Sequence, residues 1–328
     1  MIVVPVRTGE LAGHLLRDGS RSWRVKQQAD KPLASDADRI FVAGLEAIVA
    51  LDVDTGARLW RVGLGGPPTA PPLAHAGWVF VAAAGELVAL RAVDGQVIWR
   101  TAVGPVEFRP AVDGDLLIAA IVDGDLLGLD VPTGTERWRR DLGSSPSEPY
   151  AGGGRVYIGS REKKFFALDA SSGRIESAQF VGAVVMGRAT ADESHVYYAA
   201  LDNALWAVDR RHGAIKWRRP LQYRPAAGPV VIAAHVLVPG PVQSLPTFSA
   251  RTGDPAGTIA FPESLAALPL LDSFEGGLPF AVAVTGSLVN KYTLSLFIPS
   301  PVPEMPVLPL KELPGQITPL PTCCPAGR

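Results

Sequence analysis

The feature that most constrains the fold is a repeat of about 39 residues that runs through most of the chain. Turn glycines recur at intervals of 37 to 40 residues. They are Gly19, Gly56, Gly95, Gly134, Gly173, Gly213 and Gly253. Four residues after them stand Trp23, Trp60, Trp99, Trp138, Ser177, Trp217 and Gly257. A register kept over seven units indicates a chain built from copies of one supersecondary unit.

Each unit reads as a set of short β-strands. Apolar runs alternate with turns of Gly, Asp or Pro, and no stretch keeps a 3.6-residue period for a dozen residues. We therefore expect almost no helix. A period near 40 with several strands per unit fits the four-stranded antiparallel blade of a β-propeller better than a helical solenoid.

The two ends of the chain suggest how such a ring closes. The first unit begins directly on its second strand, whereas residues 316–321 resemble an inner strand that no unit follows. We predict one all-β domain over 1–328, an eight-bladed β-propeller whose ring is closed by pairing of the N- and C-terminal strands. Its units lie near 2–24, 31–64, 69–103, 108–142, 147–181, 187–221, 227–261 and a degenerate 265–297, with strands at Phe280–Val284 and Leu288–Leu294. Residues 298–315 form a Pro-rich connector.

The turn before each Trp has a plain physical reading. In the second unit, Asp52 and Thr55 have side chains that bond turn backbone, and Gly56 accepts a positive φ. Trp60 then lies on the outermost strand, where its ring packs on a neighbouring blade and its N–H finds a carbonyl. Because the residue recurs in unit after unit, we interpret Trp23, Trp60, Trp99, Trp138 and Trp217 as structural docking residues and not as ligand-stacking residues.

The pattern Ala-Leu-Asp-x-x-Thr-Gly-x-x-x-Trp at 50–60 resembles the tryptophan-docking motif of quinoprotein-like (PQQ-type) β-propeller repeats. Close copies occur at 128–138 and 207–217, while Arg91 replaces the Asp and Ser177 replaces the Trp of their units. In length and expected blade number, the chain is similar to the BamB family of outer-membrane assembly lipoproteins; the dehydrogenases that share the repeat are longer. The resemblance implies a periplasmic or cell-envelope location and a protein or peptide partner.

Composition narrows the partners further. With 31 basic and 32 acidic residues the chain has no global field to attract nucleic acid, which we exclude as a partner. No apolar stretch reaches 18 residues, so we expect no membrane span. The run Ile2–Val6 is too short for a signal-peptide core, and the chain as given shows no signal peptide. We expect a monomer.

The sequence offers no constellation for catalysis, a cofactor or a metal. The histidines are scattered about one per unit, and no P-loop, Gly-x-Ser-x-Gly or dinucleotide motif is present. The adjacent Cys323 and Cys324 are superficially similar to the vicinal disulfide of some dehydrogenases, but they lie after the expected closing strand. We therefore assign no catalytic, cofactor-binding or metal residues.

Charged residues at the starts of inner strands form one candidate site. Arg109, Glu148 and Arg188 occupy equivalent positions in three successive units, at the expected mouth of the central channel. Charges that converge on a concave opening are candidate contacts for a ligand or partner. The alternative is a structural ion-pair trio that plugs the channel.

A second candidate is a basic hairpin tip. Where other units have short, small turns, the fifth has Arg161, Lys163 and Lys164 around one acidic residue. These residues are candidate partner contacts, and the alternative is an ordinary solvated hairpin.

The leading functional prediction is a non-catalytic protein-interaction scaffold in envelope or outer-membrane protein assembly. One alternative is a small-ligand sensor, or a quinoprotein-type enzyme, that holds a quinone- or sugar-like ligand at the channel mouth. A further alternative is the sensor domain of a larger receptor or kinase.

Overall fold

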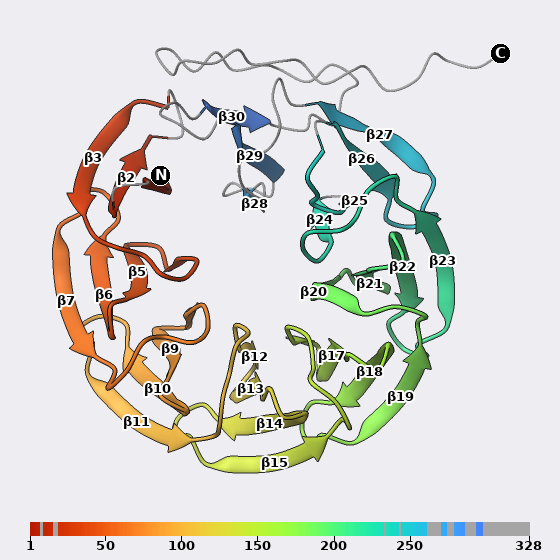
Figure 1. The fold of residues 1–328 in the computed structure, drawn as a ribbon, viewed down its shortest axis with the longest axis horizontal. Helices are drawn as coiled ribbons and strands as arrows, with labels where there is room; N and C mark the ends of the chain where they lie inside the picture. Colours follow the sequence, from red (N-terminus) through yellow and green to blue (C-terminus); the bar gives the residue numbers. More distant parts are fainter. Residues whose placement is uncertain are drawn as a thin grey trace. The chain divides into compact units, whose positions relative to one another are not determined.

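The computed structural model describes residues 1–6, 9–15, 19–232, 234–242 and 244–260, together with the backbone of 270–273, 279–285 and 293–297. Every regular element in these ranges is a β-strand, which confirms the all-β prediction. The strands form antiparallel sheets, and each sheet comes from one continuous stretch of chain (Figure 1). Contacts divide the chain into two compact units, one from Met1 to Phe180 and one that begins at Val181.

The first unit contains sheets in which the strands follow one another in chain order. The first sheet has three strands, β1 (Ile2–Val6), β2 (Glu10–His14) and β3 (Arg21–Lys26). The next two have four each: β4 (Ala34–Ser35), β5 (Arg39–Gly44), β6 (Ala47–Asp52), β7 (Arg58–Gly63); β8 (Leu73–His75), β9 (Trp78–Ala83), β10 (Glu86–Arg91), β11 (Val97–Ala102). The fourth sheet consists of β12 (Ala111–Asp113), β13 (Leu116–Ala120), β14 (Asp125–Asp130) and β15 (Glu136–Asp141). The fifth consists of β16 (Tyr150–Gly152), β17 (Arg155–Gly159), β18 (Lys164–Asp169) and β19 (Ile175–Phe180).

The second unit repeats the same plan. Its four-stranded sheets are β20 (Val185–Ala191), β21 (His195–Ala200), β22 (Ala204–Asp209), β23 (Ile215–Pro220); β24 (Val230–Ile232), β25 (His235–Leu237), β26 (Ser244–Ser249), β27 (Pro255–Ala260). A three-stranded sheet follows, with β28 (Leu270–Ser273), β29 (Pro279–Thr285) and β30 (Thr293–Phe297). β29 contains the expected strand Phe280–Val284, while β30 begins five residues after the start expected at Leu288.

The elements expected at the C-terminal end lie outside the described residues. They are the Pro-rich connector 298–315, the closing strand 316–321 and the pair Cys323 and Cys324. The blade number and the closure therefore stay predictions. At the other end, the first sheet has β1 as its first strand in chain order, followed by only two more.

The core of the four-stranded sheets lies mainly in their second and third strands. In β5 and β6, the residues from Ile40 to Leu51 that belong to strands are buried on both faces, as near-continuous apolar runs require. The outer strands are different, because mainly alternate residues are covered. In β15, Trp138 is buried while Arg137 and Arg139 on either side are exposed. Each Trp-bearing outer strand thus directs one large ring inward from a charged edge.

The docking Trp rings, four of them buried and that of Trp60 half-buried, join neighbouring sheets. Each indole Nε1 donates a hydrogen bond to a backbone carbonyl in the following sheet, 30 to 33 residues further along the chain. The pairs are Trp23 with Val53 (2.9 Å), Trp60 with Ala92 (3.0 Å), Trp99 with Val131 (2.8 Å), Trp138 with Ala170 (2.8 Å) and, in the second unit, Trp217 with Ala250 (3.2 Å). Truncation of a buried Trp to Ala costs about 3–5 kcal/mol, so each contact matters to stability.

The turn glycine of the receiving sheet makes room for the ring. Gly134 has φ +69°, and a Cβ there would lie 2.5 Å from Cδ2 of Trp99. The same holds at Gly95, where a Cβ would lie 2.8 Å from Cδ2 of Trp60. Glycine is required twice over, once for the left-handed backbone and once for the close approach of the indole.

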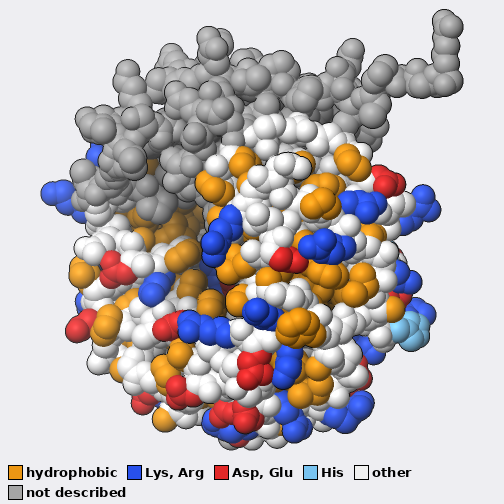
Figure 2. Space-filling view, turned by 45° about the vertical axis from the view of Figure 1, so that its right-hand side comes forward, with side chains coloured by type: hydrophobic (Ala, Val, Ile, Leu, Met, Phe, Trp, Pro, Cys, Tyr) orange, Lys and Arg blue, Asp and Glu red, His pale blue; other side chains and the backbone are white. Residues whose placement is uncertain are grey.

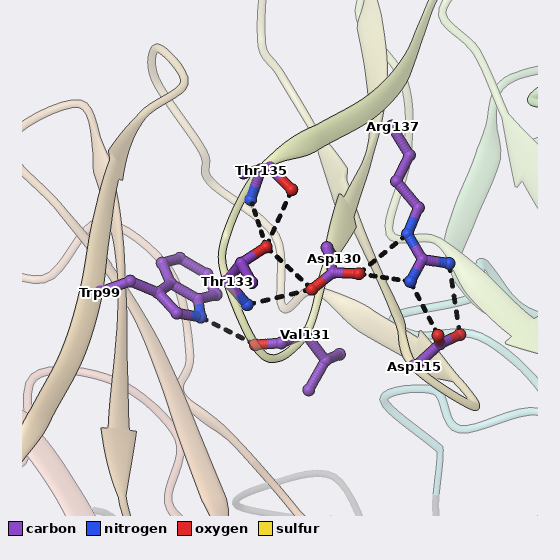
Figure 3. A network of polar contacts seen from close by, with 7 residues as sticks. All are labelled: Trp99, Asp115, Asp130, Val131, Thr133, Thr135 and Arg137. Carbon is purple, nitrogen blue, oxygen red and sulfur yellow. Dashed lines mark hydrogen bonds and ion pairs between the residues drawn. The ribbon is translucent and has the colours of Figure 1, made fainter.

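Side chains fix the turn that presents the carbonyl. Asp130 accepts hydrogen bonds from the N–H (3.0 Å) and hydroxyl (2.9 Å) of Thr133 and pairs with Arg137, which also reaches Asp115 at 2.7 Å (Figure 3). The hydrogen bond from Arg137, followed by those from Thr133, lowers the pKa of Asp130. The Asp130 and Thr133 side chains therefore hold the turn whose Val131 carbonyl accepts the hydrogen bond from the Trp99 indole (Figure 3).

In the repeat where Arg91 replaces the turn Asp, a different carboxylate fixes the turn. The carboxylate now comes from Asp94, which accepts from Arg91 Nε at 2.9 Å and from the Gln96 N–H at 3.1 Å. The hydrogen bond from Arg91 is the largest cause that lowers the pKa of Asp94 to about 2. The exchange of Asp for Arg is thus compensated within the same turn.

We predict that Gly134→Ala destabilises the protein by about 2–4 kcal/mol, since a strained backbone and an overpacked ring both contribute. Gly65→Ala is the matched control, because Gly65 has φ +80° but nothing within 4 Å of its Cβ position. It should cost about 1 kcal/mol. Urea denaturation measures both free energies of unfolding; equal losses would contradict the docking role of the glycine.

The turn carboxylates also predict a pH dependence. Because the folded-state pKa of Asp94 is about 2 against an ordinary 3.8, its contribution to stability is complete above 3.8 and is lost as the pH falls through 2. Asp94→Asn should flatten the loss of unfolding free energy between pH 4 and pH 2. Asp123→Asn, at an exposed turn residue, is the control and should leave the slope as in the wild type.

Candidate functional site

Two of the predicted channel-mouth residues lie in the first unit. Arg109 and Glu148 are half-buried and stand just before β12 and β16, each followed by a buried proline. Nη2 of Arg109 donates to the carbonyl of Leu33 at 3.4 Å, across 76 residues of sequence. Arg109 thus links the start of one inner strand to the start of another.

The third residue, Arg188, lies in the second unit and differs from its expected position. It falls inside β20, within the register irregularity between Met186 and Thr190, and not at the strand's start. Its backbone contacts Gly228 so closely that a Cβ there would overlap the Arg188 carbonyl. Arg188 lies in the second compact unit, whereas Arg109 and Glu148 lie in the first. The cluster of three charges therefore stays a prediction.

The basic tip is an ordered hairpin between β17 and β18. Arg161 and Lys163 are exposed, and Lys164 Nζ lies 2.9 Å from a carboxylate oxygen of Glu162. The tip is tied to the preceding connector, because the N–H of Arg161 donates to the Ser145 carbonyl at 3.0 Å. Lys163 has φ +63°, a conformation that L side chains rarely adopt. The cations are therefore presented on a fixed backbone.

An aromatic side chain that the sequence analysis missed lies beside this tip. Phe180, the last residue of β19, is 73% exposed and stands opposite Lys164 in the strand register. The last residues of the corresponding strands β3, β7, β11, β15 and β23 are Lys26, Gly63, Ala102, Asp141 and Pro220. Comparison of this position across the repeat would have singled out Phe180. We call Arg161, Glu162, Lys163, Lys164 and Phe180 the aromatic–basic corner.

The described part of the chain holds no group of three or more His, Cys, Asp or Glu residues placed to bind a metal ion. Within the same residues, no helix has the length and apolar character needed to cross a membrane. Acidic, basic and hydrophobic side chains are interspersed on the face seen in Figure 2. No field of one sign dominates that face.

Consecutive four-stranded antiparallel sheets with tryptophan docking define a β-propeller with PQQ-like repeats. A family model described as outer membrane protein assembly factor BamB matches residues 7–147 and 122–264. The two matches span most of the chain, so the chain belongs to this family. The resemblance stated from the docking motif is confirmed.

Solved structures agree on the fold. BamB from Moraxella catarrhalis is 20% identical, with a TM-score of 0.69 over 87% of this chain and 91% of its own. The computationally designed Ika8 protein is 12% identical, with a TM-score of 0.72 over 86% and 91%. Quinohemoprotein alcohol dehydrogenase ADHIIG from Pseudomonas putida HK5 is 13% identical, with a TM-score of 0.64 over 85% and 69%.

These structures include an assembly factor, a designed protein and an enzyme, and their low identity to this chain establishes the fold alone. No curated protein sequence matches the chain. Function therefore has to be argued from the family and from the side chains at the surface.

We predict that Lys163→Gly leaves the stability unchanged or raises it by up to about 1 kcal/mol, because glycine adopts positive φ without steric cost. Lys164→Gly, one residue later at the first position of β18, should instead cost about 0.5–1 kcal/mol. Thermal and urea denaturation of the two variants separate the cases. A larger loss for Lys163→Gly would contradict the hairpin geometry.

Proposed function

We propose that the protein is a non-catalytic interaction scaffold that takes part in the assembly of outer-membrane proteins. The observation that carries the proposal is the match of the BamB family model to two long, overlapping segments of the chain. Membership in that family also supports a periplasmic or envelope location. The partner is a protein or peptide, and the scaffold itself is a monomer.

The candidate contacts are six exposed or half-buried charged residues. They are Arg109, Glu148, Arg188, Arg161, Lys163 and Lys164. The ordered backbone of the aromatic–basic corner supports a role in binding, since little conformational freedom is lost when a fixed hairpin meets its partner. The mixture of charges on the face in Figure 2 favours a protein partner over a polyanion.

The framework behind these contacts is, in this proposal, a single eight-bladed propeller. The repeat spacing and the three-stranded first sheet support it, because residues 316–321 would supply the strand that this sheet lacks. Closure of this kind removes an exposed edge and ties the two ends of the chain together.

Similarity to a dehydrogenase at 13% identity shows a shared fold and transfers no activity. A quinone ligand is tested directly by thermal denaturation with the quinone cofactor and Ca²⁺. A stabilisation that saturates with the quinone would favour a ligand-binding function over the scaffold.

We predict that deletion of the gene in its own organism lowers the amount of folded outer-membrane β-barrel proteins. The wild-type gene should restore that amount, whereas a variant with Arg161→Glu and Lys163→Glu should restore it only partly. Heat-modifiable electrophoresis measures folded barrel protein. Arg58→Glu, on the exposed edge of β7, is the control and should behave as the wild type.

An unchanged amount of folded barrel protein after deletion would contradict the proposal. Full restoration by the double charge reversal would leave the scaffold function in place and remove the corner as its contact.

A further inference from the structure

One outer strand departs from the others at several positions. In β3, β7, β11, β15 and β23 the residue after the docking Trp is an arginine: Arg24, Arg61, Arg100, Arg139 and Arg218. In β19 the corresponding residue is Ala178, after Ser177 in the Trp position. The strand then ends on the exposed Phe180.

The arginines belong to a recurrent ion pair at the sheet edge. Four of them meet a carboxylate at or near the start of the strand that pairs with the outer strand: Arg24 with Glu10, Arg100 with Glu86, Arg139 with Asp125 and Arg218 with Asp202. In the β19 sheet this strand is β18, and Lys164 takes the first position, which Glu10, Glu86 and Asp125 hold in their strands. The edge therefore loses its guanidinium and gains an ammonium group at its corner.

This loss matters because β19 is a terminal strand. The order in its sheet is β16-β17-β18-β19, so no further strand pairs with its outer side. Charged side chains on such edges discourage the addition of another strand. Ala178 and Phe180 are exposed, whereas Glu176, near the start of the strand, pairs with Arg155 at 2.7 Å and with Arg174 at 3.4 Å. The uncharged stretch of this edge is therefore 177–180.

The only other outer strand with described side chains that lacks the arginine is β27. It carries Pro255 and Gly257 within the strand, and both disfavour strand pairing. Among the outer strands whose side chains the structure describes, β19 alone lacks the arginine and also contains no Gly or Pro. Like the other outer strands, it has a register irregularity near its start, between the partners of Ala167 and Leu168.

We propose that β19 accepts an extended segment of a protein partner as an additional antiparallel strand. Main-chain hydrogen bonds to the open edge supply most of the affinity, as in other cases of strand addition. In antiparallel pairing, the N-terminal end of the segment lies beside Phe180. The proposal rests on the proposed scaffold function and specifies the chemistry of its partner.

The aromatic–basic corner defines what that end of the segment carries. Three cations surround a single carboxylate there, and Arg161 and Lys163 are exposed. Charge complementarity selects a segment with acidic side chains at its N-terminal end, followed by an alternation of polar and apolar residues. A bilayer is less well matched, because two exposed cations contribute only about 1 kcal/mol each at an anionic membrane surface.

The test uses the full chain and a fluorescein-labelled peptide in which two aspartates precede alternating threonine and valine. Fluorescence anisotropy should show binding that Ala178→Arg weakens at least about tenfold, because this change restores the charged edge of the other sheets. Arg161→Glu should also weaken binding about tenfold through the lost charge pair. Hydrogen exchange should show protection of amides in 176–180 when peptide is bound.

Two controls keep the result specific. Ala102→Arg places the same side chain on the exposed Ala102 of β11 and should leave binding unchanged. A peptide with two lysines in place of the aspartates should bind about tenfold more weakly. Ala178→Arg should keep the wild-type unfolding midpoint, since other sheets carry arginine at this position.

Equal peptide affinity of the wild type and Ala178→Arg would overturn the proposal, as would protection confined to other strands. Binding of vesicles that contain anionic lipid, lost in Phe180→Ala, together with no peptide binding, would overturn it in favour of a membrane contact. The scaffold function is judged separately by gene deletion. A deletion effect without peptide binding refutes only the strand addition, and peptide binding without a deletion effect refutes only the assembly role.

Discussion

The contact on which the described structure depends is the hydrogen bond from an indole N–H to a carbonyl in the next sheet. A four-stranded sheet with two buried middle strands cannot cover its own faces, so it needs a neighbour at a fixed spacing. The indole supplies both apolar area and a directional bond, and the turn glycine leaves room for the ring, because a Cβ at that position would overlap it. Asp–Thr and Arg–Asp turns are two ways to hold the accepting carbonyl still.

The fold could be predicted from the sequence because its determinants are local and repeated. The turn Asp, the glycine and the Trp lie within nine residues of each other, and every unit restates the pattern. The candidate site is harder to predict from the sequence. Arg188 lies inside β20, within a register irregularity that also contains Gly187 with φ +63°. A single glycine in a strand can indicate such an irregularity, but it does not show where the strand begins. Phe180 and Ala178 were overlooked because they are ordinary strand residues whose meaning appears only when equivalent edge positions are compared.

The repeat pattern in the sequence determines the fold, but the fold does not determine the function. An assembly factor, a designed protein and a dehydrogenase share the architecture, so the repeats themselves specify no activity. One such protein differs from another at positions where the residue of a repeat departs from that of the other repeats and packing does not explain the departure. In this chain those departures concentrate in β18 and β19, at the end of the first compact unit.

The docking contacts also have a direction along the chain. Each indole lies 30 to 33 residues before the carbonyl that it meets, never after it. The carbonyl that receives each ring is therefore synthesised after the ring itself, so the docking contact of a sheet can form only after roughly one further repeat has been translated. This series of docking contacts is interrupted at Ser177. There β19, the last strand of the fifth sheet, has no indole that could donate to the sheet that follows in the chain.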